Sequence, residues 1–224
     1  MSRLHVNHLK AKLTELYSDK IDIADARSDE EKENFFLTRA YAAYTLQILA
    51  QLDALSASSA IVDGFDDNGI DAIYFDKRNK ELWLVQSKWI KNGGGEPDTG
   101  ETSRFKNGVA DLIDLKFDRF NAKVQAKETE VIEALEDPLV KIKIVLTYTG
   151  QDTFSEHNRR IIDDLLAELN DPSELAIFNR FSLKQAHKSL VGILDGQPIK
   201  ADLALSNWGK VEEPYSAIYG TING

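Results

Sequence analysis

The chain has no cysteine at all. This absence excludes disulfide bonds, thiol nucleophiles and zinc sites built from thiolates. It also agrees with a reducing compartment, so we predict a cytoplasmic protein. Histidine is scarce, with four residues, and only His5 and His8 are close in sequence. Their spacing on an expected helix predicts two surface residues rather than a zinc site.

Long apolar runs are missing as well. The most apolar segment, residues 41–50, is too short and too polar to cross a bilayer. The N-terminus runs into a charged amphipathic stretch without the apolar core of a secretory signal. We therefore expect no membrane partner. With 42% apolar and 29% charged residues among 224, the composition is that of a globular protein with one large core.

Positive charge is in short supply, and the formal net charge is −10. This charge argues against a protein that coats nucleic acid by electrostatic attraction. The distribution is uneven, because residues 77–127 hold eleven Lys or Arg against seven Asp or Glu. A nuclease needs acidic metal ligands and only a local basic rim, so the overall sign weakens a nuclease interpretation without excluding it. A solvated acidic surface explains the total equally well.

Apolar periodicity and turn residues predict the order of elements. We expect helices at about residues 4–17, 29–55, 102–117, 119–135 and 154–169. Strands are expected at 61–65, 69–76, 81–89, 141–149 and 175–181. The glycine-rich residues 91–100 predict a mobile loop without fixed structure. This order predicts an α/β fold with one mixed central sheet flanked by helices.

The segment of residues 69–89 carries the most informative pattern. It predicts two strands joined by a polar turn at 77–80, with Asp71 on the first strand and Gln86 and Lys88 on the second. Side chains two apart on a strand share a face, so Gln86 and Lys88 point the same way. A four-residue turn places Asp71 opposite Gln86. The three side chains then converge at the open end of the hairpin.

An acid, an amide oxygen and a lysine are the parts of a metal-dependent phosphodiesterase. Mg²⁺, or the similar Mn²⁺, prefers hard oxygen ligands and neutralises charge on the phosphate. Asp71 would be the anionic ligand and Gln86 a neutral one. Lys88 would position the attacking water and stabilise the charge that grows in the transition state. These three are the predicted catalytic residues.

Because Gln86 is neutral, another acid is expected to complete the metal site. Glu33, on the long early helix, is the first candidate. Asp63, Asp66 and Asp67 are alternatives, since they fall just before the hairpin. A solvated charge in an acidic first helical turn explains Glu33 equally well. On spacing alone the pattern is weak, because hairpins with an Asp and a Lys are common.

The set of Asp71, Gln86 and Lys88 resembles the PD-(D/E)XK nuclease pattern in its Q-x-K form, as in Mrr-like restriction enzymes. More narrowly, residues 66–89, with the blocks DDNGIDAIYFD and ELWLVQSKW, are similar to the N-terminal region of the AIPR family, named for abortive-infection phage resistance. The likeness covers most of residues 30–180. It implies a restriction-endonuclease-like fold, bound Mg²⁺ and nucleic-acid cleavage in bacterial antiphage defence. It assigns the ligand and lysine roles to the same three residues.

The resemblance also implies a division of the chain. We expect an N-terminal helical extension at 1–28, a nuclease-like domain at 29–200, and a tail at 201–224 that is the junction to a C-terminal domain absent from this chain. The expected activity is that of an endonuclease, with DNA favoured over RNA and a homodimer left open. The predicted nucleic-acid-binding residues are Arg104, Lys106 and Lys91. A catalytically inactive nucleic-acid-binding or protein-interaction domain with the same fold is the alternative, given the neutral Gln86 and the acidic surface.

Overall fold

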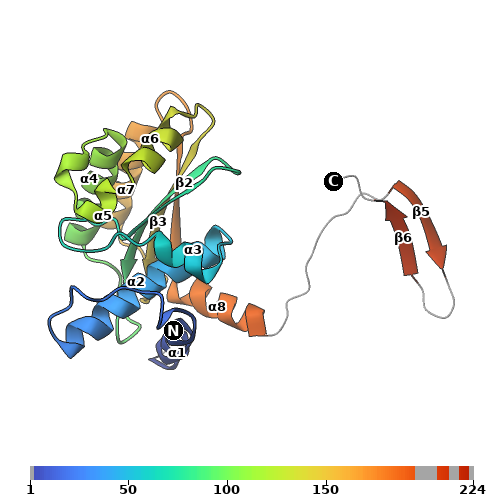
Figure 1. Cartoon of the computed structure of the whole chain (residues 1–224), viewed down its shortest axis with the longest axis horizontal. Helices are drawn as coiled ribbons and strands as arrows, with labels where there is room; N and C mark the ends of the chain where they lie inside the picture. Colours follow the sequence, from blue (N-terminus) through green and yellow to red (C-terminus); the bar gives the residue numbers. More distant parts are fainter. Residues whose placement is uncertain (1–2, 195–205, 212–216, 222–224) are drawn as a thin grey trace. The chain divides into compact units, whose positions relative to one another are not determined.

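The computed structural model describes residues 3–194, 206–211 and 217–221 (Figure 1). The chain divides into two compact units, Met1–Val191 and Gly192–Gly224. The second unit holds an antiparallel pair of strands, β5 (Ser206–Val211) and β6 (Ala217–Thr221). The predicted end of the nuclease-like domain, residue 200, lies outside the described residues.

A four-stranded sheet in the order β1-β2-β3-β4 forms the centre of the first unit. Strand β1 pairs antiparallel with β2, and β2, β3 and β4 run parallel. The predicted mixed sheet is therefore confirmed. Its strands are β1 (Ala72–Asp76), β2 (Glu81–Lys88), β3 (Lys141–Tyr148) and β4 (Ala176–Ser182).

Helices cover both faces of this sheet (Figure 1). One apolar core lies between the sheet and the helices α1 (Arg3–Tyr17), α2 (Asp29–Leu49), α3 (Ala54–Ser59) and α8 (Leu183–Leu194). The other core lies under α4 (Thr99–Ile113), η1 (Phe117–Arg119), α5 (Ala122–Gln125), α6 (Glu128–Glu136) and α7 (Glu156–Leu169). Strand β2 is buried on both faces because its alternate side chains enter different cores. None of the helices among the described residues has the length and apolar character needed to cross a membrane.

The hairpin register agrees with the sequence prediction. Strand β1 ends at Asp76, which pairs with Glu81, so the turn holds four residues. The ladder continues to the pair of Ala72 and Val85, one step before Asp71 and Gln86. Asp71 remains attached to β2 because its backbone N–H donates to the carbonyl of Val85 at 2.8 Å. The start of β1 and the end of β2 therefore lie together.

Three predicted elements are wrong in their limits. The single helix expected at 119–135 is divided into η1, α5 and α6. The helix expected to reach residue 55 ends at Leu49, because Gln51 adopts a left-handed φ of 56° and Asp53 caps the separate helix α3. The strand expected at 61–65 contributes only an isolated bridge at Ile61. Beyond it the backbone forms a loop, because the carboxylate of Asp67 accepts backbone N–H groups that a sheet ladder would otherwise use.

Helix α1 buries four side chains in the core that it shares with α2 and lies within the first compact unit. The glycine-rich loop differs from expectation. The loop of residues 91–100 has fixed anchors. Its Gly95 carbonyl accepts from Gln151 at 2.8 Å, and its Glu96 carboxylate accepts from Ser155 at 2.8 Å.

Candidate metal centre

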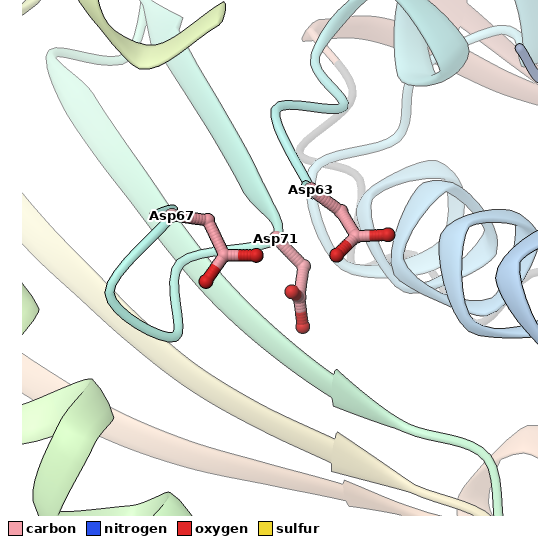
Figure 2. A group of neighbouring side chains, drawn as sticks. All are labelled: Asp63, Asp67 and Asp71. Atoms are coloured by element: carbon pink, nitrogen blue, oxygen red, sulfur yellow. The ribbon is translucent and has the colours of Figure 1, made fainter. Parts of the chain in front are cut away.

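Three aspartates meet beside the open end of the hairpin. Asp63 and Asp67 lie on the loop before β1, and Asp71 immediately precedes that strand. Each offers a carboxylate oxygen, and the three atoms lie within 4.8 Å of one another. Figure 2 shows the three side chains gathered between the loop and β2. They line a cavity of about 230 Å³.

Two of these aspartates also fix the conformation of the loop, because they accept hydrogen bonds from backbone N–H groups. Asp67 accepts from the backbone N–H of Gly64 at 3.1 Å and from that of Gly69 at 2.7 Å. Gly69 has a φ of 82°, a conformation that favours glycine. Asp71 accepts from the N–H of Ser87 at 2.5 Å, which ties the first strand of the hairpin to the second. The positions of Asp67 and Asp71 are therefore set by backbone contacts.

Gln86 also lines the cavity. Its amide nitrogen donates to the backbone carbonyl of Glu101 at 3.2 Å. Its Oε1 is buried and has no hydrogen-bond partner among the described residues. Only 8% of the residue is exposed, so bulk water does not take the place of that partner. A buried amide oxygen without a partner is costly in a folded protein. Because Gln86 lines the same cavity as the aspartates, a cation in the cavity is the partner that its chemistry fits.

Lys88 lies on the same wall and forms an ion pair with the carboxylate of Glu101. Glu101 stands in the first turn of α4 and closes a capping box with Asp98. Glu101 therefore binds both members of the Q-x-K motif. The backbone carbonyl of Glu101 accepts from Gln86, and the carboxylate of Glu101 pairs with Lys88. The sequence did not identify Glu101, although the spacing of Asp98 and Glu101 is that of a capping box.

A buried arginine fixes the third aspartate. Arg39 on α2 is only 1% exposed, and its Nε donates to Asp63 at 2.6 Å. Its other nitrogens bind both carboxylate oxygens of Asp25 at 2.6 and 2.7 Å. These bonds hold the pKa of Asp25 at about 2. Sequence patterns gave no sign of this network, because its members lie far apart in the chain.

Two aspartates in the cavity, Asp67 and Asp71, have raised pKa values. Burial raises the pKa of Asp67 to about 6, even though two backbone N–H groups oppose the shift. Burial, and then the charges of Asp63 and Asp67, raise the pKa of Asp71 well above its ordinary value. Three carboxylates this close resist simultaneous ionisation unless a cation joins them.

The predicted ligand Glu33 is not in this group. It is 46% exposed, pairs with Lys10 of α1 and lines a separate hollow. Glu33 lies in the second turn of α2 and faces α1, so the early helix does not bring it to the hairpin. Asp63 and Asp67, which were alternatives, take the place that was predicted for it.

The three predicted nucleic-acid-binding residues lie in different surroundings. Arg104 is exposed, lines the cavity and has no ion pair or hydrogen bond within the described ranges. Lys106 pairs with Glu168 of α7, and Lys91 lines the separate hollow and pairs with Glu30. Only Arg104 is therefore placed at the cavity.

Comparison of the chain with models of protein families, with curated proteins and with solved structures gave no match. The AIPR resemblance is accordingly neither supported nor opposed by them. The chemical character of the cavity rests on its own residues. The three clustered aspartates offer carboxylate oxygens, the ligands that hard divalent cations such as Mg²⁺ and Mn²⁺ prefer. The residues present fit such an ion.

Proposed function

We propose that the chain is a metal-dependent nuclease that hydrolyses phosphodiester bonds of nucleic acid. The observation that carries this proposal is the buried, unpartnered Oε1 of Gln86, a residue that lines the same cavity as four carboxylates and Lys88. An acidic cluster alone is common on protein surfaces. A buried amide oxygen that lacks a donor beside that cluster favours a cation ligand.

Asp71, Gln86, Asp63 and Asp67 would hold Mg²⁺ or Mn²⁺. The ion, when bound, neutralises phosphate charge and lowers the pKa of a bound water. Lys88 supplies a positive group on the same wall for the charge that develops on the phosphate oxygens. Arg104, without an acidic partner in the described structure, is available to a second phosphate oxygen at the rim.

The wider assignment follows from the sequence resemblance. A restriction-endonuclease-like fold agrees with a mixed sheet whose antiparallel hairpin carries the acid and the Q-x-K motif. Membership of the AIPR family, a role in antiphage defence and a cytoplasmic location complete the proposal. DNA is favoured over RNA as the substrate on the strength of the Mrr-like pattern.

Cleavage of labelled single-stranded and duplex DNA and RNA, with Mg²⁺, Mn²⁺ or EDTA, tests this function. We expect product only with a divalent ion, and a loss of at least about 100-fold in Asp71→Asn and Lys88→Met. Asp66→Asn is the matched control, because Asp66 carries the same charge on the same loop but does not line the cavity. Equal cleavage by all of these variants and the parent would refute the assignment.

The ion pair of Lys88 with Glu101 favours a second candidate, a nucleic-acid-binding domain without turnover. A lysine that is already paired with a carboxylate binds a phosphate less strongly, because the carboxylate competes for the ammonium group. In that case, oligonucleotides bind in EDTA and no product forms in any metal. Cleavage that appears in Glu101→Gln but not in the parent would identify this pair as the reason for inactivity.

A further inference from the structure

Phe65 is the most exposed large apolar side chain among the described residues, at 90%. It lies midway between Asp63 and Asp67, two residues from each. Two residues of chain span at most about 7 Å, so the Phe65 backbone lies beside two of the acids that line the cavity. Its aromatic ring is therefore exposed to solvent on the same loop that carries these two acids.

The loop that carries Phe65 is braced on both sides. Asp67 binds the N–H groups of Gly64 and Gly69 within the loop. The carbonyl of Asp66 accepts from the backbone N–H of Asn121 at 2.9 Å, and Asn68 donates to the carbonyl of Arg119 at 2.9 Å. On the other side of Phe65, the side chain of Lys123 donates to the carbonyl of Asp63 at 2.8 Å, so residues before and after Phe65 are held to the segment after α4. Its exposure belongs to an ordered loop.

The surroundings of Phe65 limit what it can bind. The rest of residues 63–69 consists of three acids, an asparagine, two glycines and no other apolar side chain. A stable protein interface needs about 800 Å² on each partner with an apolar centre, which one ring does not provide. A nucleobase needs only one aromatic face, and stacking on such a face is tolerant of sequence.

We propose that Phe65 is a base-stacking subsite for single-stranded nucleic acid at the cavity rim. This proposal rests on the proposed nuclease function, because the acids beside Phe65 would hold the ion that engages the neighbouring phosphate. A single strand is specified, since the base faces of a duplex are already covered by their neighbours. The subsite selects strands with an unstacked base and reads no particular sequence.

Binding of a fluorescein-labelled single-stranded 12-mer, measured by anisotropy in EDTA and in Ca²⁺, tests the subsite apart from cleavage. We expect Phe65→Ala to weaken binding by roughly 5- to 100-fold and Phe65→Trp to keep it. The added tryptophan emission of Phe65→Trp should be quenched as the unlabelled strand saturates the protein. Leu139→Ala is the matched control, because Leu139 is also an exposed apolar residue, at 66%, and lines no part of the cavity.

Several results would overturn the inference. These are equal binding by Phe65→Ala and the parent, unchanged emission from Phe65→Trp at saturation, or no binding of any single strand by the parent. A change of sedimentation coefficient in Phe65→Ala would also overturn it, by showing a contact between copies of the chain. If Phe65→Ala weakens binding but no metal supports cleavage, the nuclease function fails and the subsite stands. If cleavage is metal-dependent and Phe65→Ala alters neither Kd nor KM, the subsite fails alone.

Discussion

Asp71→Asn is expected to stabilise the metal-free protein. The carboxylate oxygens of the three aspartates lie within 4.8 Å of one another. At an effective dielectric constant of about 20, two unit charges at that separation repel by roughly 3.5 kcal/mol. Proton uptake limits this cost, because burial raises the pKa of Asp71. We therefore expect a gain of about 1–2 kcal/mol in the free energy of unfolding at pH 7.5.

The substitution keeps the local contact. The asparagine oxygen can still accept from the N–H of Ser87, which Asp71 accepts at 2.5 Å. Urea unfolding in EDTA and in excess Mg²⁺ or Mn²⁺ measures both effects. At 100 times the Kd, an ion that binds only the folded state should stabilise the parent by about 2.7 kcal/mol. Asp71→Asn should show no such gain, whereas Asp66→Asn should behave as the parent does.

One result would refute the reasoning. If Asp71→Asn is less stable than the parent in EDTA and the ions stabilise neither protein, the carboxylates neither repel one another nor hold a metal. The cavity would then be a polar hollow without a ligand, and Gln86 would need another explanation. A gain in stability equal to that of Asp66→Asn would mean that net charge is the cause, rather than the cluster.

Three further predictions concern positions around the site. Arg39→Met should lower the free energy of unfolding in urea by about 3–5 kcal/mol, because it leaves the carboxylate of Asp63 without its buried partner. A loss below about 1 kcal/mol would contradict this structural role of Arg39. Gly108→Ala should lower the free energy of unfolding by about 1–3 kcal/mol despite the better helix propensity of alanine, since the added Cβ would lie 2.3 Å from the carbonyl oxygen of Asn68. Unchanged urea unfolding and unchanged stabilisation by Mg²⁺ would show that the loop moves freely. Burial, and then the charges of His5 and His8, lower the pKa of His187, so the unfolded chain binds the proton more readily. The thermal midpoint of the parent should therefore fall as the pH drops below about 6.5. His187→Gln should flatten this dependence on pH, and an identical dependence would exclude the histidine group as its source.

The histidines illustrate what spacing does not predict. His5 and His8 were expected to be two surface residues of one helix. The structure brings His187 of α8 against them, with ring centroids 4.3 Å from His5 and 5.9 Å from His8. Residues separated by some 180 positions have no mutual periodicity, so only the packing of α1 and α8 on the same core creates the group.

Local sequence patterns were enough to predict the hairpin and the side chains that it brings together. Alternation along 69–89 and the four-residue turn set which side chains share a face, because the strand period is two and depends only on local backbone geometry. The tertiary structure decided which acids join Asp71. Glu33 and Asp63 were both candidates by type, but the loop bonds of Asp67 and the buried guanidinium of Arg39 place two loop aspartates in the cavity, while α1 draws Glu33 away. Contacts over such separations depend on how helices pack on the sheet, and no local pattern encodes that packing.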